Sequence, residues 1–540
     1  MTAELDHDLT IRVGLADETS YTAAVNALVD DRVASAIASG NATLWGPAAE
    51  AESGKRLAWT HLSQTSREVA DEVVALAAEL SAKGLDHIVL AGMGGSSLAP
   101  EVIAEAADVP LVVLDSSNPD FVRSALTAEL DRTVLVVSSK SGGTVETDSQ
   151  RRAFEAAFTA AGIDPLERII VVTDPGSSLE QIARETGYRT FIANPDVGGR
   201  YSALTAFGLV PTGLAGVDIH GLLDEAEAVR PLLESDAPTN VALKLGALLG
   251  VAANAGVDKL VLVNAGAAYA GFGDWAEQLI AESTGKDGKG ILPVVVAAAT
   301  SPNFAPSSPD EVLATFGPDE LPLAPASDWS VHVDGTLGGQ MLLWEYATAI
   351  AGRIMGINPF DQPDVEAAKA AARELLDGGT SSPAPTFTDG VFSVFAHNIP
   401  GSFTTAAEAF TALVGQMDET HGYLAIQAYL DRSRDVSVET VRDALAGRTG
   451  RPVTFGWGPR FLHSTGQYHK GGPATGVYLQ ITTEPSEDLA IPGRSFTFQQ
   501  FHISQAVGDG SVLAAHGRPV LRLHLDSPEA IADLIKLIDA

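Results

Sequence analysis

The chain has 540 residues, of which 45% are hydrophobic and 19% charged, a composition typical of a folded globular protein of about two to four domains. Its formal net charge of −35 argues against nucleic acid and anionic membranes as partners. It has no cysteine, which excludes disulfides, thiolate catalysis and cysteine-ligated metals. The acidic start, MTAELDHDLT, does not resemble a signal peptide, and the longest apolar runs, such as 291–299, are too short to span a bilayer, so we expect a cytoplasmic protein.

The first part of the chain predicts an α/β domain. Residues 1–59 are expected to form a peripheral helical segment, and an amphipathic helix then leads into the first strand. Apolar strands rich in Val and Ile alternate with helical stretches, which is typical of a parallel sheet covered on both faces. We assign residues 60–215 to this first domain, with strands at 87–92, 110–115, 133–139, 168–174 and 189–194.

A second α/β domain is expected over 216–376. It begins with a helix around 241–255, and its strands are expected at 259–266, 292–298 and 329–335, followed by a long helix over 338–356. The segment 377–386 (DGGTSSPAPT) is the best linker of the chain. Beyond it, residues 387–540 predict a C-terminal α/β unit, with strands at 390–398, 422–431, 453–458, 476–482 and 519–525.

Two strand-to-helix turns of the first domain carry glycines together with hydroxyl residues. They are GMGGSS (92–97) and the SSKSGGT sequence from Ser138 to Thr144. At such a turn the exposed backbone N–H groups face an anion, glycine permits its close approach, and Ser and Thr add O–H donors. Neither turn fits the dinucleotide fingerprint or the P-loop. Ordinary sheet connections are the alternative for a single turn, but the pair predicts one phosphate-binding site.

An acidic protein needs a local cluster of positive charge to hold a phosphate. The candidate cations are Lys140, Arg200, Lys286, Lys369 and Lys470.

Five motifs in order resemble the phosphoglucose isomerase family. They are GMGGSS (92–97), SSKSGGTVET (138–147), GGRYSALTAFGL (198–209), ESTGKDGKG (282–290) and NPFDQPDVEAAK (358–369). An ordered set is far more specific than any single motif. The resemblance covers roughly residues 60 to 375 and implies two parallel-sheet SIS domains, each an αβα sandwich, here followed by the C-terminal α/β unit. The layout resembles the isomerase half of actinobacterial fusions of transaldolase and phosphoglucose isomerase.

The resemblance also implies roles for individual residues. Glu282 matches the base that moves a proton between C2 and C1 of the sugar, and Arg200 matches the arginine beside the enediolate. Gln278 matches a substrate-contacting glutamine, and Gln362 and Lys369 match residues near the reacting end of the sugar. The residues implied to hold the sugar's phosphate are Ser96, Ser139, Lys140, Ser141 and Thr144, and Gly94 and Gly95 are expected to bind the substrate as well.

The ring-opening histidine departs from the family pattern. The stretch after Glu282 contains no histidine, and Met341 stands where longer family members have one. A matching sequence, FLHSTGQ, occurs instead at 461–467, so His463 is the predicted residue. His469 and Lys470 in the same loop are the alternatives. His502 and His516 are expected to be structural, because histidine has many such roles.

The expected function is that of an aldose–ketose isomerase, which interconverts glucose 6-phosphate and fructose 6-phosphate. This reaction needs a carboxylate that accepts and returns a proton and a cation beside the enediolate oxygen, without a cofactor or metal. A broader phosphoglucose/phosphomannose isomerase is one alternative. A non-catalytic SIS-domain sugar-phosphate sensor is another, although a sensor has no need of Glu282, Arg200, His463 and Lys369 together. The oligomeric state stays open, and a homodimer is one arrangement that the family suggests.

Overall fold

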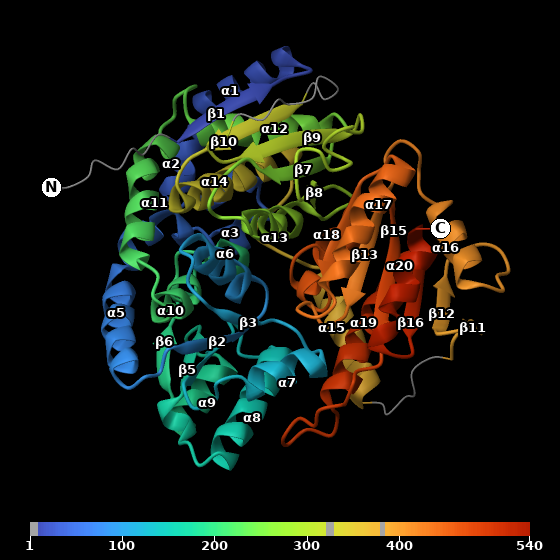
Figure 1. The fold of residues 1–540 in the computed structure, drawn as a ribbon. Coiled ribbons are helices and arrows are strands. Elements are labelled where there is room, and N and C mark those ends of the chain that lie inside the picture. Colours follow the sequence, from blue (N-terminus) through green and yellow to red (C-terminus); the bar gives the residue numbers. More distant parts are fainter. Residues whose placement is uncertain (1–8, 320–328, 378–383, 540) are drawn as a thin grey trace.

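The computed structural model describes residues 9–319, 329–377 and 384–539. They form three sheets, each with its own layers of helices (Figure 1). The expected fold class, two parallel-sheet domains and a C-terminal α/β unit, is confirmed. Within the described residues, no helix is long and apolar enough to cross a membrane. The expected linker at 377–386 lies largely outside the described residues.

The first sheet contains five parallel strands in the order β3-β2-β4-β5-β6. All five follow the strand segments expected from the sequence. They are β2 (His87–Gly92), β3 (Val112–Leu114), β4 (Thr133–Ser138), β5 (Ile169–Thr173) and β6 (Arg189–Ile192).

Alternate side chains of these strands enter two different cores, as the two-residue period of a strand requires. Val134 and Val136 pack in the core that also contains α5 (Arg67–Ala82), α6 (Leu98–Ala106) and α10 (Ala206–Ala215). Leu135 and Val137 pack in the core on the other face, formed with α7 (Pro119–Thr127), α8 (Val145–Ala160) and α9 (Ser178–Thr186). The sheet is therefore covered on both faces, which explains why its strands are apolar throughout.

The second sheet has the order β1-β10-β9-β7-β8. Its parallel strands are β7 (Lys259–Asn264), β8 (Leu292–Val295), β9 (Glu311–Phe316) and β10 (Ser330–Asp334). The N-terminal segment is not only helical as expected, because β1 (Thr10–Gly14) pairs antiparallel with β10. Strand β9 was not expected either. The helices of this domain and of the N-terminal segment are α1 (Glu18–Asp30), α2 (Val33–Ala38), α3 (Glu50–Ser53), α4 (Leu62–Thr65), α11 (Ile219–Leu233), α12 (Val241–Asn254), α13 (Phe272–Thr284) and α14 (Leu337–Met355).

The C-terminal sheet has six strands in the order β11-β12-β16-β15-β13-β14. They are β11 (Phe387–Asp389), β12 (Phe392–His397), β13 (Tyr423–Tyr429), β14 (Val453–Trp457), β15 (Gly476–Thr483) and β16 (Val520–Leu525). One face packs against α16 (Ala406–Val414), α17 (Thr440–Thr449) and α20 (Ile531–Asp539). On the other side lie α18 (Gly466–Gly471) and α19 (Phe498–Ala515).

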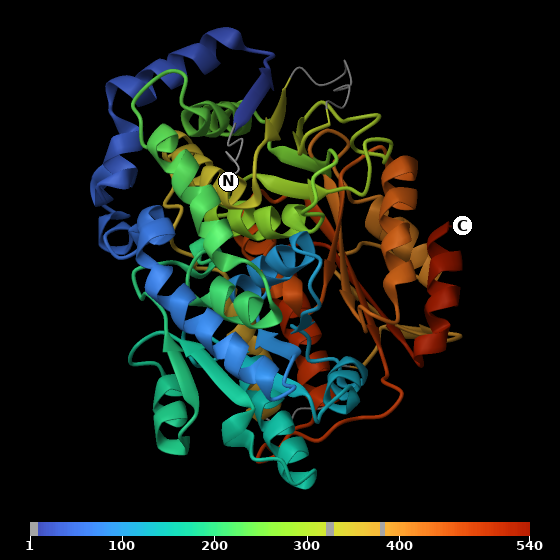
Figure 2. The ribbon, with the colours of Figure 1, turned by 60° about the vertical axis from the view of Figure 1, so that its left-hand side comes forward.

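The C-terminal unit lies against both other domains (Figure 2). Tyr423 and Tyr468 share a buried core with Val261 and Leu292 of the second sheet, so that sheet is covered on one face by the C-terminal unit. Helix α15 (Val365–Asp377) lies almost wholly within the expected second domain, which ends at residue 376, but packs against α19 of the C-terminal unit (Figure 1). The loop of His463 is thereby held between the three parts of the chain.

Candidate active site

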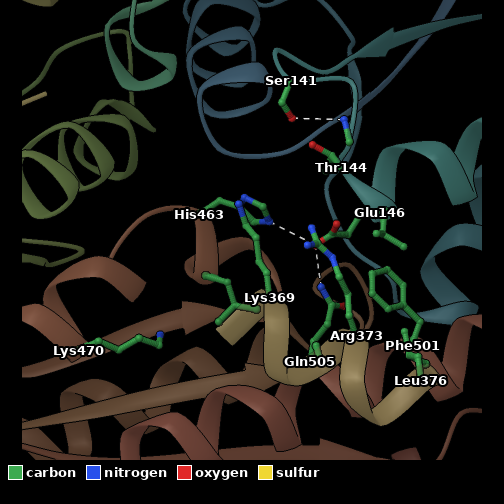
Figure 3. A pocket seen from close by; sticks show the side chains of 14 residues that line it. Ser141, Thr144, Glu146, Lys369, Arg373, Leu376, His463, Lys470, Phe501 and Gln505 are labelled. Atoms are coloured by element: carbon green, nitrogen blue, oxygen red, sulfur yellow. Dashed lines mark hydrogen bonds and ion pairs between the residues drawn. The ribbon is translucent and has the colours of Figure 1, made fainter. Parts of the chain in front are cut away.

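The turn between β4 and α8 forms one wall of a cavity of about 250 Å³ (Figure 3). The Ser139 hydroxyl donates to Thr144 Oγ1 at 3.0 Å, and the Gly143 N–H donates to Ser141 Oγ at 3.3 Å. Gly142 has φ of +71°, which a residue with a Cβ rarely adopts. Ser141 and Thr144 line the cavity at the beginning of α8, where backbone N–H groups favour an anion.

Two cations of α15 line the same cavity across from this turn. Lys369, which was predicted, and Arg373, which was not, are spaced i,i+4 and therefore share one face of the helix. Arg373 is exposed to the cavity. The two side chains supply the local positive charge that a phosphate site needs in this acidic chain. The spacing KAAAR was the only sequence signal for Arg373.

His463 also lines the cavity, and its ring contacts a buried carboxylate. His463 Nε2 lies 3.2 Å from Glu146 Oε1, and Gln505 Nε2 donates to the same oxygen at 2.7 Å (Figure 3). Burial alone would raise the pKa of Glu146, but the hydrogen bond with His463 and the charges of His463 and Lys369 outweigh it and hold that pKa below its usual value. Glu146 is thus an ionised partner that orients the imidazole.

Gln278 connects this histidine to the predicted base. Its Nε2 donates to the His463 carbonyl oxygen at 2.8 Å and lies 3.3 Å from Glu282 Oε2. Gln278 and Glu282 are one turn apart on α13, so both side chains lie on the same side of the helix. Gln278 and His463 are 185 positions apart in the sequence, and the fold therefore brings the FLHSTGQ loop to the helix of Glu282.

Arg200 is buried beside Glu282. Its Nη1 lies 3.6 Å from Glu282 Oε2 and donates to Gln362 Oε1 at 2.8 Å. Its Nε donates to Ser283 Oγ at 2.8 Å, and its Nη2 donates to the Pro359 carbonyl at 2.7 Å. These bonds fix the guanidinium next to the carboxylate, so Glu282, Arg200 and Gln362 form one cluster.

The first glycine-rich turn packs where these segments meet. A Cβ on Gly94 would lie 2.8 Å from Gln278 Nε2 and 3.0 Å from His463 Cβ, and Gly94 has φ of +56°. A Cβ on Gly95 would lie 1.9 Å from the Gly199 carbonyl oxygen, so the turn closely approaches the segment of Arg200. Gly94, Gly95 and the buried Ser96 are not among the described residues that line the 250 Å³ cavity. In this structure Gly94 and Gly95 let the turn pack closely against the segments of His463 and Arg200.

Other sequence candidates form internal pairs. Lys140 is ion-paired with Asp174 and does not line the cavity, and Lys286 donates to the side chain of Asp361 at 2.7 Å. Lys470 lines the cavity, yet its ammonium is ion-paired with Asp509 at 2.5 Å.

His469, the alternative to His463, and His502, which was expected to be structural, are both buried and do not line the cavity. His469 Nδ1 lies 3.0 Å from the Tyr423 hydroxyl, and burial lowers the pKa of His469 well below its usual value. His502 Nδ1 lies 2.8 Å from Ser117 Oγ, and burial lowers the pKa of His502 to about 4. Both residues therefore favour the neutral form, and among the histidines that the structure describes, His463 is the one that lines the cavity.

Sequence reasoning missed Glu146, Gln505 and Arg373. Glu146 stands inside the SSKSGGTVET motif two positions after Thr144, so the motif contained it without indicating its partner. Gln505 comes from α19, whose relation to α8 depends on how the C-terminal unit packs.

Comparison with known proteins agrees with this architecture. The family model of phosphoglucose isomerase matches residues 58–296. A probable glucose-6-phosphate isomerase of Haloarcula marismortui is 30% identical over 370 residues, covering 59% of this chain and 83% of that protein. A probable glucose-6-phosphate isomerase of Methanococcus maripaludis is 29% identical over 350 residues, 55% of this chain and 80% of that protein.

Solved structures share the fold at lower identity. A hypothetical protein from Thermus thermophilus superposes with a TM-score of 0.59 at 23% identity, covering 68% of this chain and all (100%) of that one. A glucose-6-phosphate isomerase from Chlamydia trachomatis gives a TM-score of 0.58 at 18% identity, covering 69% and 89%.

The two parallel-sheet domains and the hydroxyl-lined turn define a protein of the sugar-isomerase fold class. With the sequence matches above, the chain belongs to the phosphoglucose isomerase family.

Proposed function

We propose that this chain interconverts glucose 6-phosphate and fructose 6-phosphate, with Glu282 as the base and His463 as the ring-opening group. The observation that carries the proposal is the pair of Gln278 contacts, to Glu282 Oε2 at 3.3 Å and to the His463 carbonyl at 2.8 Å. They link Glu282 to the backbone of His463, which lines the hydroxyl-lined cavity; Glu282 itself is not among the described residues that line it. Relatives that are themselves named glucose-6-phosphate isomerase support the choice of substrate.

The phosphate would bind at the turn between β4 and α8. Ser141 and Thr144 supply hydroxyl donors at the N-terminus of α8, and Lys369 and Arg373 supply positive charge from the opposite wall. Binding energy from this non-reacting end of the sugar orients C1 and C2 for the chemical steps.

Ring opening is assigned to His463. A group that exchanges protons near neutral pH suits transfer between the ring oxygen and O1, and histidine is such a group. The ionised Glu146, 3.2 Å from His463 Nε2, would stabilise the protonated imidazole, so Nδ1 is the nitrogen left to face the sugar.

The proton transfer from C2 to C1 is assigned to Glu282. The carboxylate would take the C2 proton, form a cis-enediolate, and return the proton to C1. Arg200, with Nη1 3.6 Å from Glu282 Oε2, would stabilise the negative oxygen of that intermediate. Gln362 holds the guanidinium in place through its 2.8 Å bond.

Glu282→Gln tests the assignment. The amide is nearly isosteric but cannot accept the proton, so kcat should fall by about 10²- to 10⁴-fold. Inhibition by an acyclic phosphorylated sugar acid should be retained, because the phosphate site is intact. The control is Asp274→Asn, on the same helix but lining a different cavity. Near-normal turnover of Glu282→Gln would refute the proposal.

The remaining expectations on partners belong to the same proposal. A small sugar phosphate is the substrate, and the net charge of −35 disfavours nucleic acid as a partner. We propose a cytoplasmic location. A homodimer is compatible with the proposal, but all the site residues named here come from one chain.

A further inference from the structure

A second cavity, of about 520 Å³, lies behind the candidate active site. It is bounded by one face of the C-terminal sheet and by the helices α15 and α19, which also form walls of the 250 Å³ cavity. Its polar lining includes Arg522 and His524 of β16, Glu484 and Gln499, and its apolar lining includes Leu375, Leu376, Phe496, Ile503 and Val507. A volume of this size is ordinary for a small-molecule site.

Arg522 is the unusual group of this cavity. The residue is only 5% exposed, and its side chain forms no hydrogen bond or ion pair with any residue that the structure describes. Its guanidinium lies 3.6 Å from the centroid of the Phe395 ring. Burial lowers the pKa of Arg522 to about 10. A buried arginine without a counter-ion is costly, and an arginine is suited to bind a planar anion through two parallel N–H donors.

None of the other described titratable groups around the cavity forms an ion pair with Arg522. His524 Nε2 lies 3.2 Å from Glu484 Oε1, and Thr482 Oγ1 lies 3.0 Å from His524 Nδ1, so Glu484 is already engaged by the histidine. Burial and the charge of Arg522 lower the pKa of the nearby His397, which favours its neutral form. Beside Glu484 a monocarboxylate brings less negative charge into the site than a phosphate dianion, and its two oxygens match two N–H donors of Arg522.

The apolar part of the lining favours a ligand whose remaining part is hydrophobic. Leu375 and Leu376 of α15 and Ile503 and Val507 of α19 line the cavity, and Phe496 adds an aromatic side chain. These side chains offer no donors to a polyhydroxylated sugar, and they gain from contact with a hydrocarbon chain or ring.

We propose that this cavity is an effector site for a monocarboxylate with an apolar body, held by Arg522. The effector role follows from the shared helices: Lys369 and Arg373 of α15 and Gln505 of α19 face the first cavity, while Leu375 and Ile503 of the same helices face the second. Leu376 lines both cavities. A ligand in the second cavity would therefore set the spacing of two walls of the first. Only this coupling rests on the proposed function.

Isothermal titration calorimetry tests binding without any need of enzymatic activity. Hexanoate should bind the full-length chain saturably, and the uncharged hexanamide should bind at least tenfold more weakly. Arg522→Met should weaken hexanoate at least tenfold. The matched control is Arg448→Met, since Arg448 also lies over a ring, that of Phe410 at 5.8 Å, but is exposed and outside the cavity.

A second variant guards against misfolding of the first. Ile503→Trp fills the apolar part and leaves Arg522 in place, so it should also abolish hexanoate binding. No binding to the wild-type chain, or equal binding by Arg522→Met, would overturn the site. Inorganic phosphate that binds more tightly than hexanoate, in an Arg522-dependent way, would overturn the choice of a carboxylate.

Steady-state kinetics of the isomerase reaction test the effector role. Saturating hexanoate should shift the KM for fructose 6-phosphate at least threefold in the wild type and in Arg448→Met, but not in Arg522→Met. Unchanged kinetics in a wild type that binds hexanoate would overturn the effector role. If the chain binds hexanoate but has no isomerase activity, the proposed function fails and the site stands.

Discussion

Glu146→Gln is the sharpest test of the His463 assignment. Glu146 is buried, its Oε1 lies 3.2 Å from His463 Nε2, and that oxygen also accepts from Gln505 at 2.7 Å. The substitution keeps the shape of the side chain but removes the negative charge opposite the imidazole. Without that charge, the variant no longer favours the ring orientation in which Nε2 of His463 contacts residue 146 and Nδ1 faces the sugar.

The structure sets the size of the effect. A hydrogen bond to a charged group contributes about 1.5–3 kcal/mol, and each 1.4 kcal/mol is about a tenfold change in rate. We therefore expect kcat for glucose 6-phosphate to fall by about 10- to 150-fold. Because Glu146 is not assigned a contact with the phosphate, the inhibition constant of an acyclic phosphorylated sugar acid should change less than about threefold.

The assay couples fructose 6-phosphate turnover to a dehydrogenase across a range of pH. The pKa of Glu146 is held below its usual value, so the wild type keeps the carboxylate ionised at neutral pH. The wild-type carboxylate gains a proton only below the usual range of a glutamate, whereas the amide of Glu146→Gln does not titrate, so the loss of activity that protonation of Glu146 causes at acid pH should be absent from the profile of the variant. Glu155→Gln is the matched control, since Glu155 lies on the same helix but pairs with Arg151.

Two results would refute this reasoning. Full activity of Glu146→Gln would mean that the carboxylate does not act through His463. A loss of kcat with an unchanged pH profile and a large rise in the inhibition constant would mean that Glu146 only supports the fold of the phosphate turn.

The other predictions concern the phosphate turn, metals and a buried acid. The double variant Ser141→Ala, Thr144→Ala should raise the KM for fructose 6-phosphate about tenfold or more, because each hydroxyl can donate to the phosphate; an unchanged inhibition constant for a phosphorylated sugar acid would place the phosphate elsewhere. Activity should survive EDTA, since Glu282 and Arg200 supply the required charges, and a loss that a divalent ion restores would contradict this. Burial raises the pKa of Glu345 well above its usual value, so the folded state holds a proton that the unfolded chain releases above about pH 4.5, and stability falls as pH rises. Glu345→Gln should therefore gain stability over the wild type between pH 5.5 and 7.5, by up to about 1.4 kcal/mol per pH unit in urea unfolding, and a pH-independent difference would count against it.

Much of the fold could be predicted because its signals are local. The strands β2 to β6 are apolar runs bounded by turn residues, and the same holds for β12 to β16. Strand β9 was not predicted, because it follows a Pro- and Ser-rich loop and its sequence EVLATF is short. Strand β1 was not predicted, because it becomes a strand only by pairing with β10, about three hundred residues away in the chain.

The site was less predictable than the fold. The resemblance gave Glu282, Arg200 and Gln278, and the structure brings them together. The geometry of His463 could not be worked out from the sequence, because it depends on how the C-terminal unit packs against α8 and α13. For Lys140, a cation beside a phosphate turn was a reasonable candidate, but its pairing with Asp174 depends on a contact between β4 and β5.

The C-terminal unit can be understood as the support of one loop. A proton-transferring histidine must be held within about 0.5 Å of its working position, and a loop achieves this only where surrounding contacts fix it. The His463 loop is fixed from several directions: Gln278 donates to its backbone, Ser464 Oγ donates to Glu277 at 3.2 Å, and Gly94 leaves room for its Cβ. Behind it, Tyr468 is fully buried in the core shared with the second sheet. The contacts that hold this unit against the second domain are therefore the same contacts that position the histidine, so weakening that interface should reduce ring opening before it reduces phosphate binding.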